Sequence, residues 1–204
     1  MLGADWTGHP TAITQRGCCF LVFFAGGAHG SPATGVIGTA VVRVHVMTGT
    51  YATQYINSGR YCGDKVTALK AAHLGLLRGL RQCITTGWGP VHVIGGSKGV
   101  MQQQTTRRPP RAKPLRGTFW KLRRTADAVS VGSWTEQPRE YNKTATELAR
   151  LAGLTERSID WNVREQPIEG QRWRSITDYI QTDVAQWLIA HEQSTLAEGA
   201  AAKV

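Results

Sequence analysis

Residues 18–32 read CCFLVFFAGGAHGSP, and this stretch decides the fold. Its first half, up to Phe24, is an unbroken apolar run, which is typical of a strand buried on both faces. Its second half changes to glycines and a Ser-Pro pair, which are turn residues. A second apolar run, residues 35–46, follows at once. The two runs therefore predict a hairpin of two strands at the centre of a sheet.

The charge of the chain points to an anionic partner. The 204 residues carry a formal net charge of +10, with a pI near 9.9, and a surplus of this kind favours nucleic acid. The charge is also concentrated, because the segment from Arg107 to Arg124 holds eight Lys or Arg and no acid. No run reaches the roughly 18 apolar residues of a membrane span, and residues 1–17 lack the pattern of a secretory signal. We therefore expect an intracellular protein without a membrane segment.

The metal-binding residue types show no metal-site pattern. The four cysteines have no Cys-x-x-Cys spacing, and the six histidines are scattered. Buried free thiols are the expected state of the cysteines.

Strand and helix patterns alternate along the rest of the domain. The expected elements are strands over 49–57, 91–94 and 129–134, a loop over 59–63 and another over 105–114, and helices over 66–84, 97–101, 115–126 and 142–152. The helix over 115–126 is expected to carry Arg116, Lys121, Arg123 and Arg124 on its polar side. A strand–helix–strand crossover makes the first and fourth strands parallel. The fold class is therefore α/β, with a five-stranded mixed sheet in the order βββαβαβα flanked by helices.

Residues 153–204 differ from the rest and are expected to form a C-terminal extension. The segment up to Arg174 is loop-like, and Ser175 to Asp178 has the pattern of a capping box that opens a helix over about 175–190. The apolar stripe of this helix consists of Ile176, Ile180, Val184, Trp187 and Leu188. Such a stripe packs on its own domain or binds a protein partner.

Four motifs in this order resemble the type 1 ribonuclease H family. They are the glycine turn after Phe24, Thr67–Ala72, Ile94–Ser97 and Pro138–Ala149. The resemblance covers about residues 18–152 and leaves 1–17 as an N-terminal leader. The turn also looks like that of the ribonuclease H domains of retroelement reverse transcriptases, which implies a retrotransposon-derived domain.

The resemblance implies an activity that the residues argue against. The family hydrolyses the RNA strand of an RNA–DNA hybrid with two magnesium ions, which need several converging carboxylates. The four acidic positions of the family fall on Ala25, Lys65, Gly96 and Thr146. Asp64 and Glu147 each lie one residue away, but one residue on a helix is a rotation of about 100°. The family's histidine is also absent between Trp134 and Ala145. We therefore expect no intact catalytic residue, no metal and no cofactor.

Several residues are candidates for contact with nucleic acid, because they are basic or lie where the family contacts its substrate. They are Gly26, Gly27, Lys65, Arg107, Arg108, Arg111, Lys113, Arg116, Lys121, Asn142 and Lys143. Each has a structural alternative: a tight hairpin turn for the glycines, a solvated face for the basic residues, and a helix cap for Asn142. Ser97 is expected to cap the short helix in the same way.

Three functions remain as hypotheses. The first is a catalytically inactive domain that binds RNA–DNA hybrid or duplex through backbone contacts. The second is a protein-interaction module that uses the 175–190 helix or a sheet edge. The third is an active hybrid ribonuclease.

Overall fold

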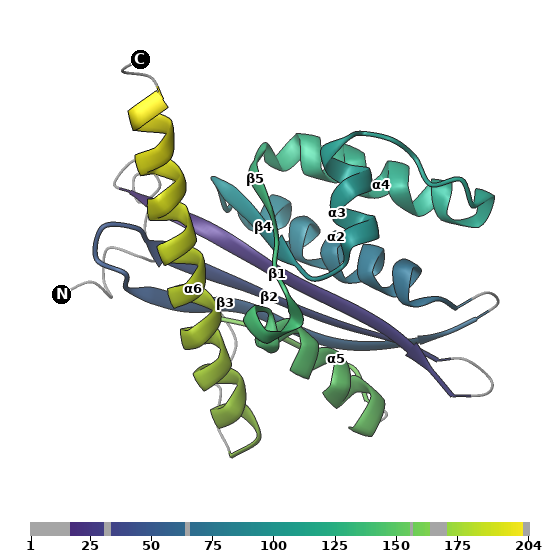
Figure 1. Cartoon of the computed structure of the whole chain (residues 1–204). Coiled ribbons are helices and arrows are strands. Elements are labelled where there is room, and N and C mark those ends of the chain that lie inside the picture. The colour runs from purple at the N-terminus through teal and green to yellow at the C-terminus, as the bar shows by residue number, and fades with distance from the viewer. Residues whose placement is uncertain (1–16, 31–33, 64–65, 156, 164–170, 202–204) are drawn as a thin grey trace.

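The computed structural model describes residues 17–30, 34–63, 66–155, 157–163 and 171–201, and within the last helix the side chains of 175–193 (Figure 1). Its strands are β1 (Cys18–His29), β2 (Thr34–His45), β3 (Tyr51–Cys62), β4 (Val91–Gly95), β5 (Val131–Glu136) and β6 (Ile159–Asn162). Its helices are α2 (Ala68–Thr86), α3 (Lys98–Thr105), α4 (Lys113–Val129), α5 (Lys143–Thr155) and α6 (Gln171–Ala201), with a 3-10 turn η2 at Arg139–Tyr141.

The described strands form one six-stranded sheet in the order β5-β4-β1-β2-β3-β6. The predicted central hairpin is confirmed, because β1 and β2 pair antiparallel over their whole length. The predicted crossover is confirmed as well, because β4 pairs parallel to β1. The mixed α/β class is therefore as expected, but the prediction of five strands is one too few.

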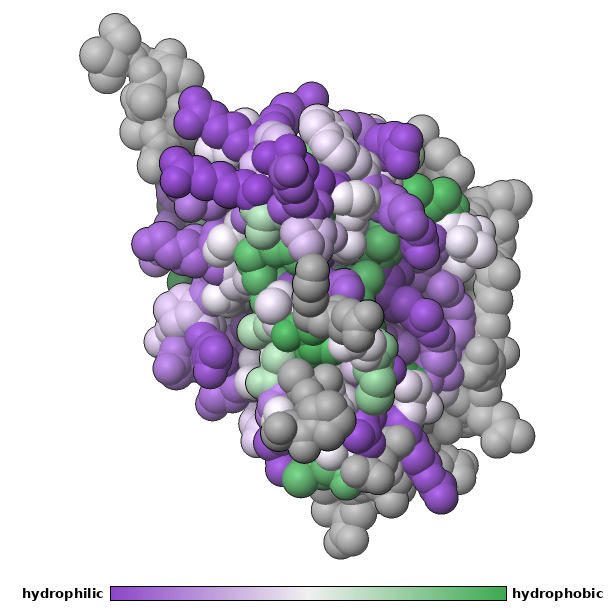
Figure 2. All heavy atoms as spheres, turned by 90° about the vertical axis from the view of Figure 1, so that its right-hand side faces the viewer, coloured by the Kyte–Doolittle hydropathy of each residue, from purple (hydrophilic) through white to green (hydrophobic). Residues whose placement is uncertain are grey.

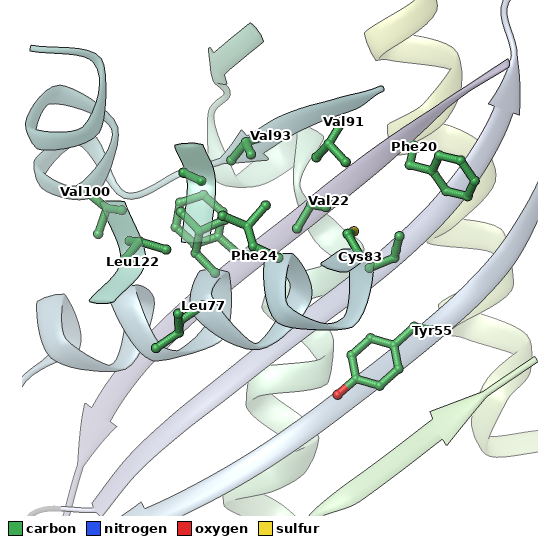
Figure 3. Close-up of a cluster of buried hydrophobic side chains, with 14 of the residues drawn as sticks. Phe20, Val22, Phe24, Tyr55, Leu77, Cys83, Val91, Val93, Val100 and Leu122 are labelled. Atoms are coloured by element: carbon green, nitrogen blue, oxygen red, sulfur yellow. The ribbon is translucent and has the colours of Figure 1, made fainter. Parts of the chain in front are cut away.

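The first seven residues of β1, Cys18 to Phe24, are all apolar because this part of the strand is buried on both faces. Phe20, Val22 and Phe24 point into a core beneath α2, which Figure 3 shows together with Leu77 of α2 and Leu122 of α4. The alternate residues of β1, among them Leu21 and Phe23, enter a second core on the other side. Helices α2, α3 and α4 cover one face and α5 and α6 the other (Figure 1).

The glycine turn is shorter than the sequence predicted. Strand β1 continues through Gly26 and Gly27 to His29, and both glycines pair with β2. The predicted loop over 59–63 is also wrong at its start, since β3 runs to Cys62. In both places the partner strand supplies a ladder of backbone hydrogen bonds that local sequence does not reveal.

Residues 153–204 contribute to the same sheet and to one of its layers. The predicted loop contains β6, which pairs antiparallel with β3 at Tyr55 to Ser58. Helix α6 begins at Gln171, so the predicted start at the Ser175 capping box is four residues late. The predicted apolar stripe is confirmed, because Ile176, Ile180, Val184 and Trp187 are buried in the second core.

Three of the four free cysteines are buried, as expected. Cys62 is the exception, because it ends β3 in an exposed position. None of the helices in the described part of the chain has the length and apolar character needed to span a membrane.

Candidate nucleic-acid interface

Two of the four residues that the resemblance assigns to acidic positions come together where β4 ends beside β1. In the parallel pairing, Phe24 lies opposite Gly95, so Ala25, which is still within β1, lies beside Gly96, the residue that follows β4. Lys65 lies outside the described residues. The strand register therefore places two of the positions next to each other.

The third position is tied to the same point by the start of α5. The side-chain amide of Asn142 donates to the backbone oxygen of Phe24 at 2.9 Å. Thr146 lies one helical turn later, and its backbone N–H donates to the backbone oxygen of Asn142 at 3.2 Å. The structure thus brings Ala25, Gly96 and Thr146 to one end of the central strands.

The side chains at these three positions offer a methyl group, a hydrogen and a neutral hydroxyl. Magnesium prefers anionic oxygen ligands, so these groups do not fit a two-ion centre. Glu136 pairs in register with Gly95 and is exposed, whereas the nearby Glu147 forms an ion pair with Arg150. Within the described ranges, no three His, Cys, Asp or Glu side chains are close enough to share a metal ion.

An arginine side chain lies beside the Gly96 position. A Cβ built on Gly96 would lie 3.8 Å from Cγ of Arg139, an exposed residue at the start of η2. Lys143, the first residue of α5, is exposed and lies with its Nζ 5.9 Å from the Tyr179 ring. The region around Gly96 therefore carries both exposed basic residues and the exposed carboxylates of Glu136 and Glu140.

A comparison with protein-family models matches residues 33–152 to the family described as reverse transcriptase-like. The chain belongs to the reverse-transcriptase-like family. None of the curated proteins compared with the chain matches it.

Solved ribonuclease H structures share the fold of this reverse-transcriptase-like chain. The chain is similar to RNase H1 from Halobacterium salinarum, with 24% identity and a TM-score of 0.53 over 68% of this chain and 98% of that one. It is also similar to LC11-RNase H1 isolated from compost, with 23% identity and a TM-score of 0.56 over 68% and 97% of the two chains. The N-terminal RNase H domain of a Mycobacterium tuberculosis protein matches with 23% identity and a TM-score of 0.51, over 64% and 95%. The predicted ribonuclease H-like fold is therefore confirmed.

The basic segment of this reverse-transcriptase-like domain contains two residues that pair with the carboxylate of Asp127, and a third, Arg116, donates to the Pro110 backbone oxygen at 3.2 Å. Arg123 was predicted on the polar side of α4, but the helix buries it, and its guanidinium donates to the Gln104 backbone oxygen at 2.9 Å. Arg123 also forms an ion pair with Asp127 at 2.5 Å, and Arg107 approaches the same carboxylate at 3.2 Å. The hydrogen bond from Arg123 holds the pKa of Asp127 below its usual range. These two arginines therefore stabilise α4 and the loop before it.

The other six basic residues of the segment face solvent. They are Arg108, Arg111, Lys113, Arg116, Lys121 and Arg124, and none has an acidic partner among the described residues. Trp120 stands among them with 49% of its surface exposed. Figure 2 shows hydrophilic side chains gathered on the upper part of one face, at the height of α4 in Figure 1. We call these six residues with Trp120 the α4 basic surface.

Two candidate residues have packing roles. A Cβ on Gly26 would lie 2.1 Å from the backbone nitrogen of Ala72, so α2 approaches β1 too closely for any side chain there. Asn142 is 1% exposed and its side chain joins α5 to β1. Gly27 is half-buried in β1, with space for a Cβ that only Val36 would touch, at 3.3 Å.

Sequence reasoning missed the residue that caps α5. The predicted cap, Asn142, gives its amide to β1, and its Oδ1 has no partner among the described atoms. The carboxylate of Asp183 on α6 accepts from the backbone N–H groups of Lys143 at 3.2 Å and Thr144 at 2.8 Å. Ser97, the other predicted cap, precedes α3 without a side-chain hydrogen bond to it. No local pattern connects α6 with α5, because the cap spans about 40 residues of chain.

Proposed function

We propose that this chain is a ribonuclease H-like nucleic-acid-binding domain that binds RNA–DNA hybrid or duplex and does not cleave it. The observation that carries the proposal is the convergence of Ala25, Gly96 and Thr146 at one end of the sheet, with Arg139 beside them. The resemblance assigns these three positions to acids of the family, and here they supply no negative charge for magnesium.

The charges that surround this point support binding in place of hydrolysis. In the ribonuclease H family, metal ions hold a phosphate of the substrate at this point. Here we expect the Arg139 guanidinium and the Lys143 ammonium group to donate hydrogen bonds to that phosphate instead. The α4 basic surface adds six exposed cations, which suit contacts to a phosphate backbone and give affinity without sequence preference. Together they account for affinity to a polyanion without a catalytic step.

The second hypothesis was a protein-interaction module, and the main surface predicted for it is not available to a partner. The apolar stripe of α6 is buried against the chain's own sheet, so a partner would have to bind the outer side of α6. Ile189, with 52% of its surface exposed, is the large apolar side chain on that side. One isolated apolar residue is ordinary for a protein surface, so no specific observation favours this alternative.

The test is a titration of labelled RNA–DNA hybrid, double-stranded RNA, double-stranded DNA and single strands at two salt concentrations. Magnesium is present, and the products are separated on a gel with a chelator lane beside each reaction. The expected result is binding to hybrid or duplex that weakens with salt, with the strands intact. Magnesium-dependent cleavage that the chelator abolishes would overturn the inactive assignment. Absence of binding at low salt would overturn the proposal as a whole.

A variant pair separates the proposed contacts from general charge. Arg139→Gln removes the cation beside Gly96 and is expected to weaken hybrid binding several-fold. Arg150→Gln removes the same charge from a residue that is engaged with Glu147 on α5, so it is expected to bind as the wild type does. Equal losses in the two variants would show that net charge alone determines the affinity.

A further inference from the structure

The exposed side of α4 carries an aromatic ring between its charges. Helix α4 packs on α2 with its apolar side and lies at the edge of the molecule in Figure 1. Trp120 is on the exposed side, and Lys113, Arg116 and Arg124 lie seven residues before it, four before it and four after it. These spacings place all four side chains on one face of the helix. We call these four residues the Trp120 stripe.

The Trp120 ring is held at the surface by the core. It makes an edge-to-face contact with the ring of Phe119, with 5.0 Å between the centroids and 75° between the planes. Phe119 is fully buried and fixes this side of the indole, while 49% of the Trp120 surface stays exposed. A single exposed apolar residue is ordinary for a protein surface, so the surroundings of the ring decide what it can bind.

The helix leaves open space next to this ring. Gly117 lies three residues before Trp120 on the same face, and a Cβ built on Gly117 would meet no atom within 4 Å, the indole included. Glycine is unfavourable inside a helix because it loses the most backbone freedom on folding. Its missing side chain leaves room here for a planar group to lie against the indole.

Positive charge lies on both sides of this space. Arg116 and Arg124 are each about 6 Å along the helix axis from Trp120. Arg116 donates to a backbone oxygen of the preceding loop at 3.2 Å, which holds the guanidinium in place without neutralising it. Helix α4 begins without a side-chain cap and without an acid in its first turn, so its dipole adds to the positive potential. The first acid along the helix, Asp127, is engaged by two other arginines.

A flat ring with cations before and after it matches a nucleotide. The ring offers a stacking surface to a base, and the cations offer donors to the phosphates on its two sides. In a duplex the flat faces of the bases are covered by the neighbouring base pairs, so only an unpaired base can lie on Trp120. An acidic peptide would use the cations and leave the face of the indole in water.

We propose that the Trp120 stripe binds a single-stranded nucleic-acid segment, with one base stacked on Trp120 beside Gly117 and the adjoining phosphates on Arg116 and Arg124. This inference rests on the proposed function, because it specifies which part of a nucleic acid the α4 basic surface holds. The nucleic acid that binds best therefore has unpaired nucleotides next to its paired part.

The experiment is an anisotropy titration of the full chain with three labelled RNA–DNA hybrids of one sequence. One is blunt, one has a DNA tail of about six thymidines, and one has a tail of equal length without bases. Stacking favours the thymidine tail, which is expected to bind about tenfold more tightly than the abasic tail. Equal affinities for the two tails would overturn the inference, and binding of the blunt hybrid would still uphold the proposed function. Binding of the thymidine tail without binding of the blunt hybrid would uphold the stripe and overturn the proposed hybrid binding.

Variants localise the stacking through the ratio of the two tail affinities. Trp120→Ala is expected to reduce this ratio to about one, whereas Trp120→Phe keeps an aromatic face and most of the ratio. Gly117→Leu fills the space beside the indole at a position where leucine suits the helix, and it should also lower the ratio towards one. Ile84→Ala, which removes another exposed apolar side chain from α2, is the matched control and should keep the ratio. A wild-type ratio in both Trp120→Ala and Gly117→Leu would overturn the site.

Discussion

Single residues decide what the end of the central strands can do. Ala25, Gly96 and Thr146 occupy positions that the fold holds together, so their side chains determine which chemistry this point of the framework can support. Arg139, which belongs to the Pro138–Ala149 motif, lies beside Gly96. With no carboxylate at these three positions, nothing there offsets the repulsion between a nearby cation and a divalent metal ion.

Restoring the acids is therefore expected to restore metal binding. The triple variant Ala25→Asp, Gly96→Asp and Thr146→Asp places three carboxylates together, which repel one another until a cation joins them. At position 96 the new Cβ would lie 3.2 Å from the backbone oxygen of Gln137, and a shift of this backbone by a few tenths of an ångström would relieve the contact. We expect millimolar manganese or magnesium to raise the melting temperature of this variant by several degrees and that of the wild type by far less. The matched triple Asn variant should not respond, and an equal response would contradict the charge argument.

One buried histidine and one half-buried histidine make the stability depend on pH. Burial lowers the pKa of His73, a fully buried residue whose Nδ1 lies 2.9 Å from the Leu69 oxygen. Burial, together with His191, lowers the pKa of His92. Below the usual histidine pKa of about 6.5, the unfolded chain binds protons that the folded chain does not, so the stability falls as the pH falls.

His73→Gln is expected to reduce this pH dependence. The measurement is the free energy of unfolding from urea titrations at pH 7.5, 6.5 and 5.5. The wild type should lose stability over this range, and the variant should lose less, because one of the two sources is removed. If the free energy of unfolding of the variant falls with pH as steeply as that of the wild type, His73 is not a source of the pH dependence.

At the scale of elements, α6 determines how α5 begins. The Asp183 carboxylate accepts two backbone N–H groups at the start of α5, and burial raises the pKa of this carboxyl. The stripe from Ile176 to Trp187 packs in the same core as Leu148 of α5. Helix α6 therefore holds the helix that carries Thr146 in register with the strands.

Asp183→Ala should destabilise the fold through the loss of this cap. Loss of a capping side chain costs about 1–2 kcal/mol, and we expect a decrease of that size in the free energy of unfolding. Asp178→Ala, which removes an exposed carboxylate from the same helix, is the matched control and should change the stability little. A small loss in Asp183→Ala would show that packing of the stripe alone positions α5.

The sequence predicted the elements that carry their own signal. Strand β1 was found from its unbroken apolar run and the stripe of α6 from the helical period of its apolar residues, and both are local properties. Strand β6 has four residues and half-buried side chains, so it becomes a strand only by pairing with β3. The ion pair of Arg123 with Asp127 could have been predicted from its i,i+4 spacing, but the burial of Arg123 depends on its bond to Gln104, which has no such signal. The Asp183 cap depends on a contact between distant segments and has no local signal.

At the scale of the whole molecule, positive charge lies on two sides of α2. One side carries the α4 basic surface, and the other carries Arg60, Arg78 and Arg81, which line one pocket. The sheet and α2 form a rigid base between them, because α2 packs on β1 along a buried face.

The salt dependence of hybrid binding tests the first of these surfaces. Each phosphate contact contributes about 0.9 to the slope of log affinity against log salt, so Lys113→Gln, Arg116→Gln and Arg124→Gln together should reduce the slope by about 2 to 3. The matched control is Arg81→Gln, Arg150→Gln and Arg157→Gln, which removes the same charge from surfaces away from α4. The slope measured for the control should stay near the wild-type value, because the slope depends only on how many cations contact phosphate. An equal reduction in both triple variants would show that the net charge of the chain determines the affinity, and the α4 basic surface would then have no special part in it.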